Sequence, residues 1–108
     1  MKDFGDLVLC DRCVGRTHVY VWAELRDGKL TISGCDTGSF TEEFWGGSDY
    51  EYWYSLDRRN TEKLFSAIHG GADPQAALLR EFGGEGGCGK LRAFCEENGI
   101  ACRFDAYA

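Results

Sequence analysis

The sequence has little of what a membrane protein or a nucleic-acid-binding protein needs. No stretch approaches the roughly 20 apolar residues that span a bilayer. The first six residues carry two acids and no apolar run, so we expect a cytoplasmic protein without a signal peptide. The net charge is −6 and the pI is 4.8. Because affinity for phosphate backbones depends on Lys and Arg, we expect neither direct nucleic-acid binding nor membrane binding.

Catalytic residue sets are also scarce. The chain has two histidines, His18 and His69, which leaves little material for a Cys–His nucleophile. The glycine-rich segment 84–90 has the spacing of a phosphate-binding loop, but Leu91 stands where Ser or Thr must hold magnesium, and Glu85 puts a negative charge in the cradle. Adjacent carboxylates such as those of Glu42 and Glu43 occur without signs of an enclosed cleft. We predict that the protein is not an enzyme.

Hydrophobic alternation predicts strands in the first half of the chain. From Thr17 to Leu25, the even-numbered side chains, including His18, Tyr20 and Trp22, share one face, and the apolar odd-numbered ones share the other. Asp27-Gly28 predicts a type I′ hairpin turn, which makes 29–35 the return strand and places Cys35 opposite Tyr20. A short apolar run at 7–9 precedes this hairpin, and 50–57 alternates again.

The second half has a helical period. We expect helices over 61–69, 74–82 and 90–98, the first capped by Asn60 and the second by Asp73 with Pro74 at its first position. Inner-face positions are Leu64, Phe65 and Ile68, then Leu78, Leu79 and Phe82, then Leu91, Phe94 and Cys95. Gly70, Gly83 and Gly99 end the helices, with Gly99 left-handed so that Ile100 packs back on Cys95. A last strand covers 101–107.

The predicted order is β-β-β-β-α-α-α-β. This order favours an α+β fold with an antiparallel sheet of about five strands and three helices packed on one face. At 108 residues, with 44% hydrophobic and 14% aromatic residues, the chain has enough apolar surface for one core. We expect a single domain over 1–108, made of a knuckle-and-hairpin portion, 1–35, and a strand-helices-strand portion, 50–108.

Six cysteines in a cytoplasmic protein favour metal ligation or burial over disulfides. Cys10-x-x-Cys13-x-Gly15 has the spacing of a zinc knuckle, in which one tight turn offers two thiolates. The hairpin register brings His18 diagonally beside Cys35. We therefore predict a structural zinc site made of Cys10, Cys13, His18 and Cys35, with Cys102 or Asp36 as alternatives to His18. The alternative for each cysteine is a buried thiol.

An acidic and aromatic segment separates the two halves. Between Lys29 and Arg58 there is no Lys or Arg, while the segment holds six acids and seven aromatic residues. Aromatic anchors amid acids suit a basic protein partner. The alternative is that the aromatics are core and the acids keep a loop in water. We predict partner contacts from Glu42, Glu43, Trp45, Asp49, Glu51 and Trp53.

Two resemblances add expectations. The segments YWYSLDRRNTEKL at 52–64, LREF at 79–82 and FCEENGIACRF at 94–104 resemble a family of small uncharacterised proteins of gut Firmicutes and their mobile elements, over about half of the chain. That family implies no activity. The size, acidity and metal-knuckle N-terminus resemble the phage-encoded anti-CRISPR inhibitors of type II systems, which include a metalloprotein.

The second resemblance implies a stoichiometric inhibitor in the host cytoplasm that binds Cas9 and blocks nucleic-acid loading, because such inhibitors occupy basic surfaces that Cas9 uses for guide or target. We expect a monomer whose acidic aromatic surface makes the contact. The alternative function is a zinc-stabilised housekeeping or immunity-type interaction module with another partner, and a thiol redox enzyme ranks third.

Overall fold

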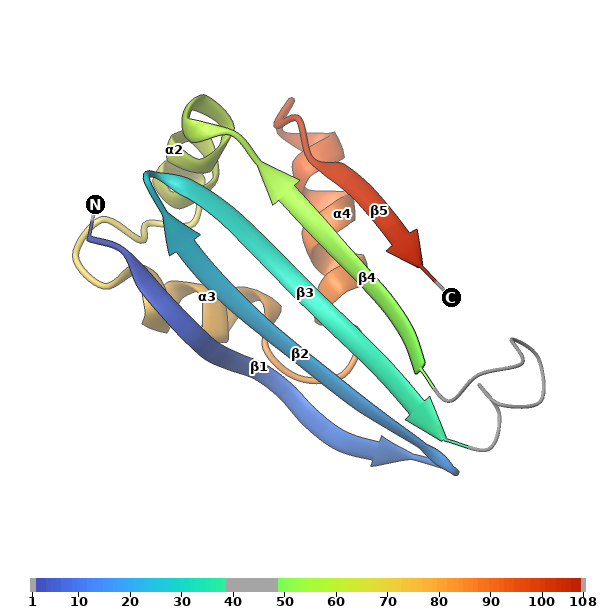
Figure 1. The fold of residues 1–108 in the computed structure, drawn as a ribbon. Helices are drawn as coiled ribbons and strands as arrows, with labels where there is room; N and C mark the ends of the chain where they lie inside the picture. Colours follow the sequence, from blue (N-terminus) through green and yellow to red (C-terminus); the bar gives the residue numbers. More distant parts are fainter. Residues whose placement is uncertain (1, 39–48, 108) are drawn as a thin grey trace.

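The computed structural model describes residues 2–38 and 49–107. They form a five-stranded antiparallel sheet in which each strand pairs with its neighbours in chain order, β1-β2-β3-β4-β5 (Figure 1). The predicted α+β fold and element order are confirmed. The elements are β1 Phe4–Val14, β2 Thr17–Arg26, β3 Lys29–Gly38, β4 Asp49–Leu56, α2 Arg58–Ala67, α3 Pro74–Phe82, α4 Gly87–Glu97 and β5 Arg103–Tyr107.

The hairpin between β2 and β3 sets the register of the sheet. Asp27 and Gly28 have φ of 53° and 74°, as the central residues of a type I′ turn require. Arg26 consequently pairs with Lys29, which is the first of ten residue pairs without a bulge. Tyr20 lies opposite Cys35, so the predicted register is confirmed.

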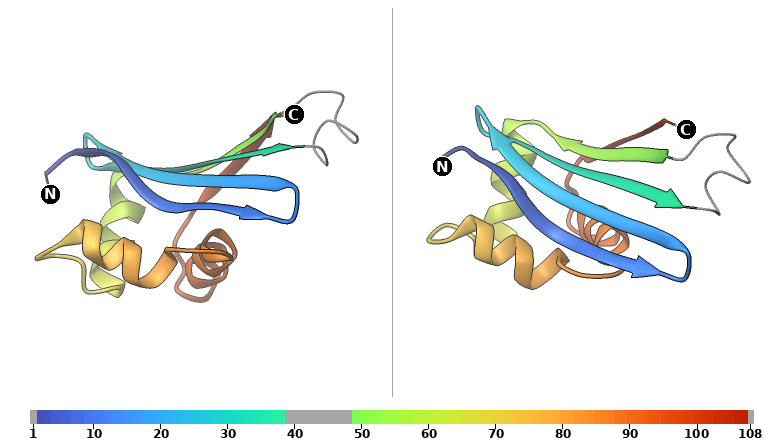
Figure 2. Two further views of the ribbon diagram at one scale, coloured as in Figure 1. Left: turned by 90° about the horizontal axis from the view of Figure 1, so that it is seen from below. Right: turned by 60° about the horizontal axis from the view of Figure 1, so that its bottom comes forward.

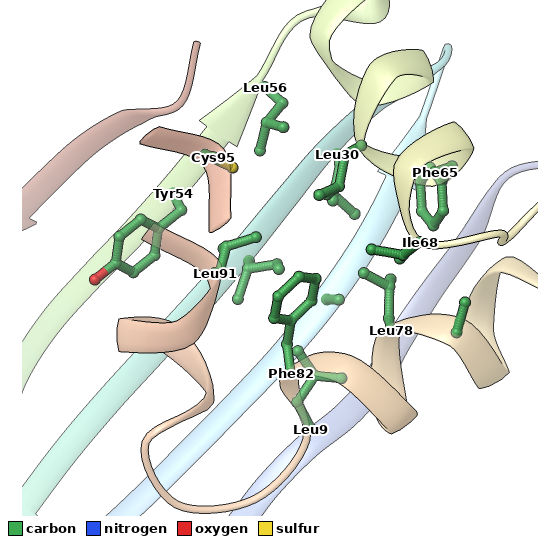
Figure 3. Packing of buried hydrophobic residues seen from close by; sticks show 14 of the residues in the cluster. Leu9, Leu30, Tyr54, Leu56, Phe65, Ile68, Leu78, Phe82, Leu91 and Cys95 are labelled. Atoms are coloured by element: carbon green, nitrogen blue, oxygen red, sulfur yellow. The ribbon is translucent and has the colours of Figure 1, made fainter. Parts of the chain in front are cut away.

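The helices α2, α3 and α4 all lie on one face of the sheet, as Figure 2 shows with the sheet edge-on. The side chains between sheet and helices form one buried cluster (Figure 3). Strand residues in it alternate with residues on the other face, as expected for an antiparallel sheet covered on one side. Its fully buried large apolar members are Phe65, Leu25, Leu30, Ile32, Leu64, Leu78 and Leu91.

The first strand differs from its prediction. β1 is a single strand from Phe4 to Val14, with register shifts before Leu7 and before Cys10, and it passes through the segment expected to be a tight turn. The chain reverses instead at Gly15 and Arg16, with Gly15 at φ 64°. Pairing with β2 fixes this stretch as a strand, so the expectation of a turn at Cys10–Cys13 is wrong.

The start of α2 also differs from its prediction. The helix begins at Arg58, and its N-cap is Asp57, whose carboxylate accepts the backbone N–H of Asn60 at 2.8 Å. Asn60 was expected to be the cap. It is instead buried, and its Oδ1 accepts the N–H of Ala101 at 2.8 Å, tying α2 to the segment before β5.

The ends of the other helices agree better. Asp73 caps α3, accepting the N–H of Ala76 at 3.0 Å, and Gly83 follows the helix as predicted. Leu79 was expected on the inner face of α3, but it is 44% exposed. The last helix, α4, begins at Gly87, three residues before its predicted start at Lys90. Among the helices in the described ranges, none has the length and apolarity to cross a bilayer.

Candidate functional site: the open face of the sheet

The sheet face opposite the helices, called the open face below, carries rows of side chains set by strand register. One row crosses all five strands through Asp11, Tyr20, Cys35, Glu51 and Tyr107. The next row crosses them through Val8, Trp22, Ser33, Trp53 and Asp105. The open face therefore brings together side chains from all five strands, from β1 near the start of the chain to β5 near its end.

A small notch lies between the two tryptophans of the open face. Ser33 on β3 is directly between Trp22 on β2 and Trp53 on β4. Because serine is short, the two indoles stand on either side of a hollow of about 200 Å³. Glu51, which is exposed, also lines this hollow. Two aromatic walls with a carboxylate beside them are a geometry that suits an organic cation.

Beneath the notch, the backbone of β3 comes close to an aromatic ring. A Cβ on Gly34 would overlap the Tyr52 ring, which lies across this glycine on the helix side of the sheet. Glycine is thus required for Tyr52 to lie against β3. Burial raises the pKa of the Asp36 carboxyl. Tyr52 donates a hydrogen bond to this carboxyl, which lowers its pKa by less, so the pKa stays above its ordinary value.

An aromatic stripe runs along β2 beside the notch. The ring centroids of His18 and Tyr20 are 6.4 Å apart, and those of Tyr20 and Trp22 are 5.4 Å apart. His18 Nε2 lies 2.6 Å from the Oδ1 of Asp11, which fixes the ring against β1. The stripe ends at the notch, so a row of rings along β2 leads up to the two tryptophans.

The two ends of the open face differ in charge. Near the β2–β3 hairpin, acids have basic partners: Arg26 Nε is 3.0 Å from Glu24, and Arg103 Nε is 3.1 Å from Asp105. A hollow of about 530 Å³ lies at this end and is lined by Lys29, Asp57 and Arg103 among others. The opposite end carries Glu51, and there β3 ends and β4 begins, on either side of the acidic segment 39–48 in the sequence.

The predicted partner-binding residues are only partly visible. Glu42, Glu43 and Trp45 lie outside the described residues. Asp49 begins β4, with its backbone opposite Thr37. Glu51 and Trp53 both lie on the open face, as successive residues of β4 on that side of the sheet.

Sequence reasoning missed Trp22 as a member of the site. The alternation of β2 already placed Trp22 on the face of His18 and Tyr20. The confirmed hairpin register also places it opposite Ser33. Only the pairing of β3 with β4, which the sequence does not specify, brings Trp53 to the other side of the same serine.

The four predicted zinc ligands do not lie together. Cys10 pairs with Val21 and is 5% exposed in the core on the helix side. Cys13 pairs with His18 and lies on the open face. It is three residues from Cys10, and side chains three apart in a strand point to opposite sides of the sheet. Cys35 shares the face of His18, diagonally from it. As placed, the set does not fit one tetrahedral ion, and structural zinc stays a prediction.

The alternative ligands do not complete the set. Asp36 pairs with Val19 and lies on the helix side. Cys102 precedes β5, at the sheet corner diagonal to Cys13. Across residues 2–38 and 49–107, no three His, Cys, Asp or Glu side chains are grouped so that they could hold a metal ion.

The glycine-rich segment before α4 lies over the helix side of the sheet. Gly84 donates its N–H to Leu9 O at 2.7 Å, and the segment lines a hollow of about 180 Å³ together with Cys10 and Cys88. Burial raises the pKa of the Cys88 thiol to about 11. A thiol with such a pKa is largely protonated at neutral pH and is a poor nucleophile.

Comparison of the chain with protein-family models, with curated proteins and with solved structures finds no match in any of the three.

Proposed function

We propose that the protein is a stoichiometric binding protein that holds a basic surface of a protein partner against its open face. The observation that carries this proposal is the notch in which Trp22 and Trp53 flank Ser33 beside Glu51. Its occupant is an arginine or lysine side chain of the partner. A guanidinium group stacked on indole and paired with a carboxylate is stabilised by both cation–π and charge-assisted contacts.

The charge of the chain supports a basic partner. The net charge is −6, and the segment between Lys29 and Arg58, which includes β4, has six acids and no Lys or Arg. Near the notch, Glu51 is exposed, so it is available to attract a cation in solution. Such complementarity raises association rates and disfavours acidic partners.

The aromatic stripe supports a protein partner over a free small cation. His18, Tyr20 and Trp22 present consecutive rings along β2. Tyr107 is 71% exposed at the far edge of the sheet, in the row of Tyr20. Tyr and Trp are enriched among the residues that dominate binding energy in protein interfaces. An extended surface of this kind suits a macromolecule that contacts several strands at once.

Cas9 is the specific partner that the anti-CRISPR resemblance suggests, and inhibition would follow if this protein covers a basic channel that guide or target must enter. The proposal is therefore tested at two levels. Binding of a nona-arginine peptide tests the open face, and binding of guide-free Cas9 and of its separate lobes tests the partner.

For the peptide, we expect Trp53→Ala to weaken binding about tenfold, since the notch loses one aromatic wall. Glu51→Lys should weaken it further and reduce its dependence on salt. The matched control is Glu97→Lys, which makes the same change in net charge at an exposed position of α4, on the helix side. Equal losses for Glu51→Lys and Glu97→Lys would show that only total charge matters and would overturn the open face as the site.

For Cas9, we expect a complex in gel filtration that Trp53→Ala weakens and Glu97→Lys leaves intact. An absence of binding at micromolar concentration, alongside peptide binding that depends on the notch, would reject Cas9 as the partner and leave the binding surface standing.

A further inference from the structure

Two cysteines outside the open face are brought together where the chain reverses after α4. The helix ends at Glu97, and Gly99, at φ 65°, takes the left-handed conformation. Ile100 then donates its N–H to Cys95 O at 2.9 Å. This reversal directs the chain back along the helix, so that Cys102 arrives beside Cys95.

The returning segment is held from two directions. Ile100 is 6% exposed in the core, and the N–H of Ala101 is bound by Asn60 of α2 at 2.8 Å. Both cysteines line one hollow of about 140 Å³, between α4 and the start of β5. The Cys95 thiol donates a hydrogen bond to the sulfur of Cys102. Cys102 thus has little freedom to move away from Cys95.

We propose that Cys95 and Cys102 form a reversible dithiol–disulfide pair that is oxidised by low-molecular-weight disulfides such as glutathione disulfide. Their juxtaposition carries the proposal: both residues line the same hollow, a hydrogen bond joins their thiols, and the backbone on either side is fixed. A disulfide requires its two cysteines to be close and held in place.

The two cysteines have different roles in the exchange. Cys102 is partly exposed and also borders the hollow at the hairpin end of the sheet, so a reagent reaches it from solvent. The hydrogen bond from Cys95 lowers the pKa of Cys102, and the cation of Arg92 lowers it further, against the opposing effect of burial. Cys95 is 2% exposed. Cys102 is therefore the attacking thiol and Cys95 the resolving one.

The reaction balances as thiol–disulfide exchange. The Cys102 thiolate attacks one sulfur of glutathione disulfide, forms a mixed disulfide and releases one glutathione thiolate, which takes up the proton that Cys102 lost. Cys95 then loses its proton and attacks the Cys102 sulfur, which releases the second glutathione as a thiol. Two electrons pass from the two cysteines to glutathione disulfide, and a Cys95–Cys102 bond replaces its S–S bond.

Oxidation would fix an edge of the sheet. In the described structure, β5 pairs with β4 alone, and it carries Asp105 and Tyr107 of the open face. A bond from Cys102 to α4 anchors the residue just before this strand to the helix layer. The pair thus gives the protein a redox-dependent stability at one side of the open face, whether or not the binding function proposed above holds.

The test uses the full chain with Cys13→Ser, because Cys13 is exposed and would react on its own. The protein is incubated with glutathione disulfide, its remaining thiols are alkylated, and trypsin is added. Cleavage after Arg92 and Arg103 releases a peptide, residues 93–103, that contains both cysteines and no internal Lys or Arg. We expect this peptide to lose two hydrogens and to take no alkyl group.

Thermal unfolding gives a second readout. We expect the oxidised protein to unfold on the order of 10 °C higher than the reduced protein, since a bond that closes even a short loop lowers the entropy of the unfolded chain. Dithiothreitol should reverse the shift. Cys95→Ala should accumulate a glutathione adduct on Cys102, whereas Cys102→Ser should leave Cys95 unmodified. Cys88→Ser is the matched control and should oxidise as the parent does. Full alkylation of both cysteines after oxidation would overturn the proposal.

Discussion

The hydroxyl of Thr61 joins three elements, and its removal offers a sharp test of how the helix layer is attached. Thr61 is 1% exposed in the first half of α2. Its Oγ1 accepts the N–H of Leu30 in β3 at 3.1 Å and donates to Leu56 O at the end of β4 at 3.3 Å. Leu30 and Leu56 are themselves buried, so water does not replace either partner.

We expect Thr61→Val to destabilise the protein by about 2–4 kcal/mol. Valine keeps the shape of threonine but leaves a buried N–H and a buried carbonyl without this partner, and each such group costs about 1–3 kcal/mol. The lower part of the summed range applies because the carbonyl has a second acceptor position. For a domain of this size, such a loss lowers the unfolding temperature by roughly 10 °C or more.

Urea unfolding of the reduced protein measures the effect. Thr61→Ser is the matched control: it keeps both hydrogen bonds and loses one buried methyl group, which costs about 1 kcal/mol. If Thr61→Val stayed within about 0.5 kcal/mol of the parent, or if Thr61→Ser were the less stable variant, the hydroxyl would not be what attaches α2 to the sheet.

Two further predictions concern ionisation and metal. Because burial raises the pKa of Asp36 above its ordinary value of 3.8, its ionised form destabilises the folded state at neutral pH, and this penalty disappears as pH falls below that ordinary value. Asp36→Asn should therefore raise the free energy of unfolding at pH 7 and leave it unchanged near pH 3, as urea titrations at both values will check. The zinc prediction is tested by overnight dialysis against a chelator, since a structural ion stabilises the folded state. Zinc released in proportion to protein, with a fall in the unfolding temperature, would confirm it. An unchanged unfolding temperature would reject it and agree with the placement of Cys10 and Cys13 on opposite faces of β1.

The features that sequence reasoning predicted well depend on residues close together in the chain. Asp27-Gly28 fixes a turn whose register follows from its geometry, so the partner of Cys35 was predictable seven residues beyond Gly28. Asp73 and Pro74 start α3 by their own chemistry, and Gly99 ends the last helix for the same reason. Each of these signals acts before any tertiary contact forms.

The features that were predicted wrongly depend on distant partners. Both Asp57 and Asn60 are able to cap a helix. The contact that occupies Asn60, with Ala101, is 41 residues away. Leu79 sits next to Leu78 in an apolar run, but neighbours on a helix are about 100° apart, and the sheet covers only one of them. The C-x-x-C spacing suits a turn in isolation, yet pairing with β2 makes it a strand.

The candidate site follows the same division. Alternation along β2 and β4 places Trp22 and Trp53 on the polar face of their own strands. The notch exists because a third strand supplies a small residue between them, at Ser33. A larger side chain there would fill the hollow without disturbing the core on the other face. We infer that the residue at this position, more than the tryptophans alone, decides whether the open face has a notch or a closed aromatic surface.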